Sequence, residues 1–202
     1  MGFRSRFGFP EPKPSQRSLG DFGLEAEEVS FPTVDRSLPG WFVPAQDGRG
    51  PAVILVHGWE SNHARMLPMA HAFHDAGLHA FLFDARGHGG NPAKRYMTAA
   101  EFVGDVAAAL EYVAIRREVD KVGLFGHSAG GTASILAASR DSRVRAVVSS
   151  SAFAGPVELT QRLLGLGGSP PGGHLQSSSL ASTSGLVVTA WPTTMPGRGS
   201  RR

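Results

Sequence analysis

Apolar residues along the chain alternate between two kinds of spacing, which predicts strands that alternate with helices. Residues 52–56 read Ala-Val-Ile-Leu-Val, a continuous apolar run without polar alternation. Such a run is typical of a parallel strand that is buried on both faces of its sheet. Similar short runs predict further strands at 80–83, 121–125 and 144–149.

Helical spacing of apolar residues occurs in the intervals between these strands. It predicts helices over 64–76, over a segment that begins at Thr98, and over 129–139. Thr98 and Glu101 have the spacing of a capping box, in which two side chains satisfy free amide groups at a helix start. The succession of strand and helix predicts an α/β fold with a mostly parallel sheet and right-handed crossovers.

The N-terminal part of the chain predicts an arm that is followed by a β-hairpin. Residues 1–24 are rich in Pro, Arg and Gly without a sustained period, which favours an irregular arm. Residues 26–31 and 38–43 are rich in β-forming residues and flank a turn-forming segment that begins at Pro32. We expect them to form an antiparallel hairpin at one edge of the sheet.

The C-terminal part interrupts the alternation of strand and helix. From Gly165 onward, 23 of the 38 residues are Gly, Pro, Ser or Thr, and only residues 186–188 form an apolar run. We therefore predict an incomplete α/β domain over 25–164, whose C-terminal strands are missing or disrupted. A low-complexity, disordered tail is expected over 165–202.

Composition and charge exclude several classes of protein. The chain of 202 residues contains no Cys, which excludes disulfides and thiolate metal sites. Four Arg and no acid follow residue 158, so the net charge of +3 arises in the tail rather than on a basic face for nucleic acid. No apolar run approaches the ~20 residues of a membrane span, and no signal peptide is recognisable. We expect a cytoplasmic protein that binds no nucleic acid and does not span a membrane.

One segment between a predicted strand and a predicted helix has the spacing of a nucleophile elbow, G-x-S-x-G. It comprises Gly126, His127, Ser128, Ala129 and Gly130. The two glycines leave room for a sharp turn that exposes the Ser128 hydroxyl. The free amide of Ala129 at the helix start can stabilise an anionic oxygen.

A second loop follows the predicted strand 52–56 at the same, carboxyl edge of the sheet. It begins with His57, Gly58 and Trp59. The Trp59 amide has the position of a second donor to an anionic oxygen. We predict that His57 orders this loop and transfers no proton, because a nucleophile elbow of this form goes with the chain order Ser, acid, His, in which the base follows the nucleophile.

A third loop follows the predicted strand 80–83 and contains Asp84, Arg86 and His88. Glycines on both sides of His88 allow a tight loop at the edge where open α/β folds place their sites. Asp84 and Arg86 could be catalytic or could pair with each other, and we favour the pairing, which would support the loop. The remaining histidines near the first helix share no face with carboxylates, so no metal site is expected.

These motifs together resemble the α/β-hydrolase superfamily, in particular single-domain bacterial serine hydrolases similar to the S33 serine aminopeptidase and carboxylesterase branch. The resemblance covers about residues 25–160. It implies hydrolysis of ester or amide bonds in a small-molecule or peptide acyl substrate, without a cofactor. Ser128 would attack the carbonyl carbon, and the amides of Trp59 and Ala129 would hold the oxyanion.

The chain departs from this family after the elbow. The triad carboxylate and histidine are expected after two further strands, but no Asp or Glu follows Glu158, and the only later histidine is His174. His174 lies in a stretch rich in Pro and Gly, which does not hold an imidazole in the geometry that catalysis needs.

Two hypotheses account for this departure. In the first, residues near 165–202 are a frameshifted or truncated version of the family's C-terminal half, and the hydrolase is catalytically impaired. In the second, the short form is a non-catalytic interaction module. The strand at 144–149 would then expose an open sheet edge, through which the chain could bind a partner or self-associate.

Overall fold

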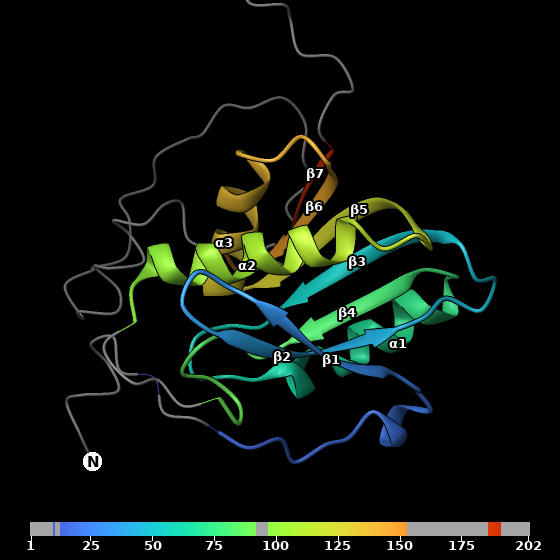
Figure 1. Ribbon diagram of the computed structural model, residues 1–202, viewed down its shortest axis with the longest axis horizontal. Coiled ribbons are helices and arrows are strands. Elements are labelled where there is room, and N and C mark those ends of the chain that lie inside the picture. The colour runs from blue at the N-terminus through green and yellow to red at the C-terminus, as the bar shows by residue number, and fades with distance from the viewer. Residues whose placement is uncertain (1–9, 11–12, 92–96, 153–185, 191–202) are drawn as a thin grey trace, which may run out of the picture.

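The strands that the sequence predicts lie in one sheet in the computed structural model, which describes residues 10, 13–91, 97–152 and 186–190 (Figure 1). The sheet order is β1-β2-β4-β3-β5-β6-β7. The strands are β1 (Glu27–Pro32), β2 (Ser37–Val43), β3 (Gly50–Val56), β4 (His79–Phe83), β5 (Val119–His127), β6 (Val144–Ser150) and β7 (Leu186–Ala190). β4, β3, β5 and β6 are parallel, while β2 is antiparallel to both β1 and β4. The predicted N-terminal hairpin and mostly parallel sheet are therefore confirmed.

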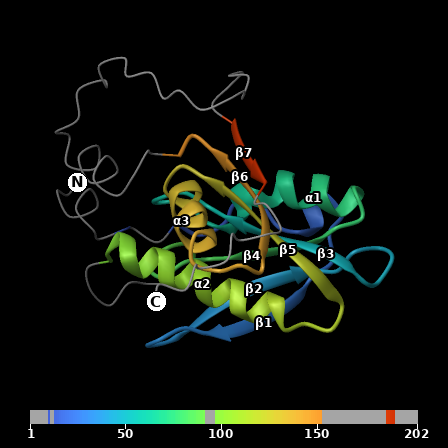
Figure 2. The same ribbon diagram turned by 90° about the horizontal axis from the view of Figure 1, so that it is seen from above.

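Helices cover both faces of this sheet (Figure 2). They are α1 (Leu67–Asp75), α2 (Ala99–Ala114) and α3 (Ala129–Ala138), together with the short 3₁₀ helices η1 (Gly20–Phe22) and η2 (His63–Met66). The predicted capping box is present at the start of α2, where Thr98 and Glu101 bond to each other's backbone amide. α2 and α3 pack on one face, and α1 packs on the other.

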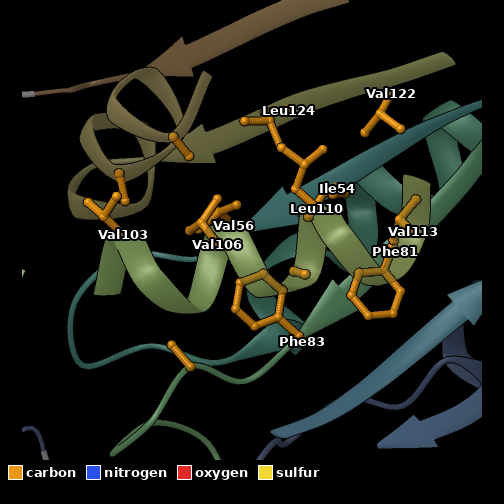
Figure 3. Packing of buried hydrophobic residues seen from close by; sticks show 14 of the residues in the cluster. Ile54, Val56, Phe81, Phe83, Val103, Val106, Leu110, Val113, Val122 and Leu124 are labelled. Carbon is orange, nitrogen blue, oxygen red and sulfur yellow. The ribbon is translucent and has the colours of Figure 1, made fainter. Parts of the chain in front are cut away.

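Successive side chains of β3 alternate between the two faces of the sheet. Ile54 and Val56 of β3 belong to the cluster under α2, whereas Val53 and Leu55 belong to the cluster under α1. Figure 3 shows the larger cluster. Its labelled members include Phe81, Phe83, Val103, Val106, Leu110 and Val113. A strand that is buried on both faces needs apolar residues at every position, which explains the continuous apolar run in the sequence.

Two segments outside the predicted alternation of strands and helices also belong to the folded part of the chain. The apolar run at 186–188 lies in β7, which pairs antiparallel with β6, so β6 has a neighbour on each side. The prediction that the strand at 144–149 leaves an open sheet edge is therefore wrong, because β7 covers that edge. Leu24, in the predicted arm, is buried in the cluster under α1. The boundary near residue 165, His174 and the rest of the predicted disordered tail, apart from β7, lie outside the described residues. No helix in the described ranges is long and apolar enough to cross a membrane.

Candidate active site

Ser128 occupies the sharp turn between β5 and α3 with an unusual backbone conformation. Its φ of 54° and ψ of −121° lie in a region that residues with a side chain rarely adopt. The Ser128 amide donates a hydrogen bond of 2.8 Å to the Ser150 carbonyl on β6. Ser128 is half-buried, and its hydroxyl makes no hydrogen bond to any described residue. The fold therefore imposes a strained backbone at Ser128, of the kind that concentrates at functional sites.

The two glycines of the elbow allow α3 to start in direct contact with β3. A Cβ atom on Gly126 would lie 2.4 Å from the Gly130 carbonyl oxygen. A Cβ atom on Gly130 would lie 2.3 Å from the His57 carbonyl oxygen and 2.5 Å from that of Val56. Real Cβ atoms do not approach backbone oxygens so closely, so the turn requires glycine at both positions.

The loop after β3 lies against the elbow. The position of a Cβ atom on Gly58 is 3.4 Å from the Ser128 Cβ atom and 3.3 Å from the His127 carbonyl oxygen. Trp59 follows at once in the chain, and Ala129 is the first residue of α3, where amides have no partner within the helix. The structure thus brings together the loop and the turn that carry the two predicted oxyanion donors.

His57 joins this loop to the loop after β4. Its Nδ1–H donates to the Gly58 carbonyl at 2.8 Å, and its Nε2 accepts from the Ala85 amide at 3.1 Å. Both bonds require one neutral tautomer, and burial of the ring lowers the pKa of His57. This arrangement suits the predicted role of ordering the loop.

The prediction that Asp84 and Arg86 pair with each other is wrong, because each has a partner from another element. Asp84 accepts hydrogen bonds from the His63 amide at 2.7 Å and from its Nδ1 at 3.0 Å. Arg86 binds Asp105 of α2, with 2.6 Å between Nη2 and Oδ1. Asp105 is fully buried, so its charge requires a cation. The sequence held one signal for this contact, since Asp105 lies on the apolar face of its predicted helix.

Gly89 makes room for the carboxylate of Asp84. Its φ is 59°, and a Cβ atom there would lie 1.8 Å from Asp84 Oδ2. Burial raises the pKa of Asp84, but the hydrogen bonds and the charge of His63 outweigh burial and lower it. Asp84 therefore stays ionised and ties the loop after β4 to η2.

The His63–Asp84 pair has the arrangement of a base that is oriented by a carboxylate. The His63 ring stacks on Trp41 of β2, with ring centroids 3.7 Å apart. Asp84 directly follows β4, and β3 lies between β4 and β5, the strand that leads to Ser128. Among the described residues, the hydrogen bonds of this pair run between His63 and Asp84 and do not reach the Ser128 hydroxyl. No metal-binding cluster of His, Asp or Glu occurs in the described part of the chain.

His88 is buried between the loops and is expected to make the protein less stable in acid. Burial lowers the pKa of His88 to about 3, while an unfolded histidine has a pKa of about 6.5. Between these values only the unfolded chain binds the proton, so the stability falls as the pH falls below 6.5. The expected loss from pH 7 to pH 5 is about 2 kcal/mol.

Urea unfolding at both pH values measures this loss. His88→Asn keeps a donor for the Arg86 carbonyl, which His88 Nδ1–H bonds at 2.9 Å. We expect this variant to lose about 2 kcal/mol less than the natural chain between pH 7 and pH 5. An equal pH dependence in both proteins would contradict a neutral, buried His88.

Comparison with known proteins gives a family and several relatives. The sequence pattern of the family described as serine aminopeptidase, S33, matches residues 49–182. An uncharacterized protein of Mycobacterium tuberculosis is 33% identical over 128 residues, which cover 61% of this chain and 44% of that protein. A polyketide transferase of Aspergillus fumigatus is 33% identical over 132 residues, which cover 62% of this chain and 45% of the transferase. The chain thus spans less than half the length of these two relatives.

A solved structure establishes the fold. An esterase of Pyrococcus furiosus superposes with a TM-score of 0.62 at 22% sequence identity, and the match covers 72% of this chain and 55% of the esterase. The predicted α/β-hydrolase fold is therefore confirmed for the described part of the chain.

Proposed function

Because this chain belongs to the serine aminopeptidase S33 family of hydrolases, we propose that it cleaves ester or amide bonds of an acyl substrate with Ser128 as its nucleophile. The observation that carries the proposal is the backbone of Ser128. Ser128 has a φ of 54°, a value that residues with a side chain rarely adopt. The carboxyl end of β3 lies against the same turn. Strained conformations of this kind persist where the surrounding fold enforces them, and they concentrate at functional sites.

The proposed reaction begins with attack of Ser128 Oγ on the substrate's carbonyl carbon while a base removes the hydroxyl proton. The carbonyl oxygen becomes an oxyanion, to which the amides of Trp59 and Ala129 donate hydrogen bonds. The intermediate then expels the leaving group, which takes the proton from the base, and water releases the acyl group by the same steps. Loss of one such oxyanion donor typically costs 10²–10³ in rate.

The proposal assigns the nucleophile and the oxyanion hole to described residues, and it leaves the base and its carboxylate unassigned. His174 is the only histidine after Ser128, and no acid follows Glu158. A serine hydrolase without an intact triad retains about 10³–10⁴-fold acceleration over water from its oxyanion hole and substrate binding. We therefore expect weak hydrolysis from this chain.

The relative that is named a polyketide transferase favours a second candidate. In this candidate, an alcohol or amine instead of water takes the acyl group from Ser128. Product analysis with an activated acyl ester distinguishes the two, since hydrolysis yields the free acid and transfer yields a new ester or amide.

Ser128→Ala is expected to abolish covalent labelling by a fluorophosphonate probe. The Ser128 oxygen would attack phosphorus and expel fluoride, and alanine has no such oxygen. Labelling of the purified chain is followed by gel fluorescence. Ser142→Ala, on the exposed loop between α3 and β6, is the matched control and should label like the natural chain.

Absence of labelling in a folded natural chain would overturn the assignment of Ser128 as an activated nucleophile. A cooperative thermal melt of the same sample establishes that it is folded. That outcome would favour the impaired hydrolase or the non-catalytic module instead.

A further inference from the structure

Two buried nitrogen atoms, one in the loop after β3 and one in the loop after β4, have no hydrogen-bond partner among the described residues. One is Nε2 of His88, a residue with 0% exposure, and the other is Nε1 of Trp59. The two rings lie 5.2 Å apart between centroids and are nearly perpendicular, at 80°. A buried polar atom without a partner is costly, so two of them on neighbouring rings call for a shared explanation.

The two atoms have opposite hydrogen-bonding roles. His88 Nδ1 lies 2.9 Å from the Arg86 carbonyl oxygen, which can only accept, so Nδ1 carries the proton. Burial keeps the ring neutral by lowering its pKa to about 3, so Nε2 presents a lone pair. The indole nitrogen of Trp59 can only donate.

A hydroxyl group between the two atoms would satisfy both, because its oxygen can accept from Trp59 and its proton can be donated to His88. Charged groups do not fit as well. A carboxylate would accept from the indole but would face the lone pair of Nε2, and an ammonium group would have no acceptor site for the indole proton.

The surrounding residues hold both rings in place. The His88 ring stacks on Phe102 of α2, with an interplanar angle of 13° and centroids 5.6 Å apart. It also lies 5.0 Å from the His57 ring, whose two nitrogens are already bonded. Trp59 packs against the cluster under α2. The fully buried His88 ring therefore cannot turn its nitrogen to solvent.

We propose that His88 Nε2 and the indole N–H of Trp59 form a binding site for one hydroxyl group, supplied by a trapped water molecule or by an alcohol. The same residue, Trp59, carries the backbone amide that we assign to the oxyanion hole, so the bound hydroxyl fixes the loop that presents this amide. The inference goes beyond the proposed function and does not rest on the reactivity of Ser128.

The test follows the indole N–H signals in ¹H–¹⁵N spectra of the full chain. Three tryptophans give three signals, and Trp59→Phe identifies the one that belongs to Trp59. We expect a rotating-frame cross-peak from water to this indole proton. His88→Phe should abolish the cross-peak, and His88→Gln should retain it, because the glutamine oxygen can replace Nε2 as an acceptor.

A matched control comes from a histidine outside this loop. His71→Phe changes an exposed ring on α1, whose ion-pair partner is the exposed Asp75 of the same helix, so it should leave the Trp59 cross-peak unchanged. A change at Trp59 in this variant would show that the signal reports general disturbance of the fold, and it would overturn the assignment to His88.

Titration with propan-1-ol distinguishes the two sources of the hydroxyl. A saturable shift of the Trp59 signal that replaces the water cross-peak, and that His88→Phe loses, identifies an alcohol site. A cross-peak that persists throughout identifies a trapped water. A folded natural chain with neither effect overturns the proposal, even if His88→Phe does not fold. If the natural chain is not labelled by the fluorophosphonate probe but shows the Trp59 cross-peak, the assignment of Ser128 as nucleophile is wrong and the hydroxyl site stands.

Discussion

Replacement of Gly130 by alanine is expected to destabilise the protein by about 3 kcal/mol or more. The new Cβ atom would lie 2.3 Å from the His57 carbonyl oxygen and 2.5 Å from that of Val56. Both are backbone atoms at the end of a central strand, so relief of the clash requires α3 to move away from β3. The midpoint of urea unfolding measures the loss, and fluorophosphonate labelling of Ser128 should fall with it.

Gly104→Ala provides the matched control for this prediction. Gly104 is also helical, but it is exposed on α2, and a Cβ atom there meets nothing within 4 Å. Alanine is favoured over glycine in a helix by up to about 1 kcal/mol, so this variant should be more stable than the natural chain. Equal unfolding midpoints for the two alanine variants would contradict the close contact of α3 with β3.

The sequence predicts most of this fold because its strands and helices are set by local spacing. Residues 52–56 are apolar at every position because β3 is covered on both faces, and that requirement is visible without the structure. The pairing of β7 with β6 was not predicted. It joins segments that are about 40 residues apart, and no local pattern specifies such a partner.

In the candidate site, too, local motifs are predictable from the sequence, whereas contacts between distant elements are not. Ser128 and the glycines around it were found because a sharp turn requires small residues at fixed spacing. The partners of Asp84 and Arg86 come from η2 and α2, and the sequence carries no rule for which buried acid meets which buried cation. The contact between Trp59 and His88 likewise depends on how two loops after neighbouring strands meet.

Arg86→Met is expected to lower the free energy of unfolding by about 3–5 kcal/mol, because it leaves the charge of Asp105 buried without the guanidinium that pairs with it. Asp105 has 0% exposure, and Arg86 bonds it through its side chain and through its amide, at 3.0 Å. Urea unfolding at pH 7 measures the loss. A loss below 1 kcal/mol would mean that the pair contributes no more than an exposed salt bridge.

The pH dependence of the same variant separates the loss of charge pairing from the loss of packing. Burial raises the pKa of Asp105, and the hydrogen bonds from Arg86 oppose that rise. Without Arg86, the folded pKa of Asp105 rises further above its unfolded value. The folded state then binds a proton more readily than the unfolded state, so the destabilisation should be smaller at pH 4 than at pH 7.

Addition of Asp105→Asn to Arg86→Met should recover most of the lost stability. The asparagine is neutral, and its side-chain oxygen can still accept the amide of residue 86, which donates to Asp105 Oδ2 in the natural chain. We expect the free energy of unfolding of the double variant at pH 7 to lie within about 1–2 kcal/mol of that of the natural chain. Residues 86 and 105 of the double variant carry no titratable group, so they should add no pH dependence between pH 4 and pH 7. A double variant as unstable as the single one would show that the guanidinium acts by filling space. In that case Arg86 would support the loop after β4 through its contacts with neighbouring side chains, and its charge would be dispensable.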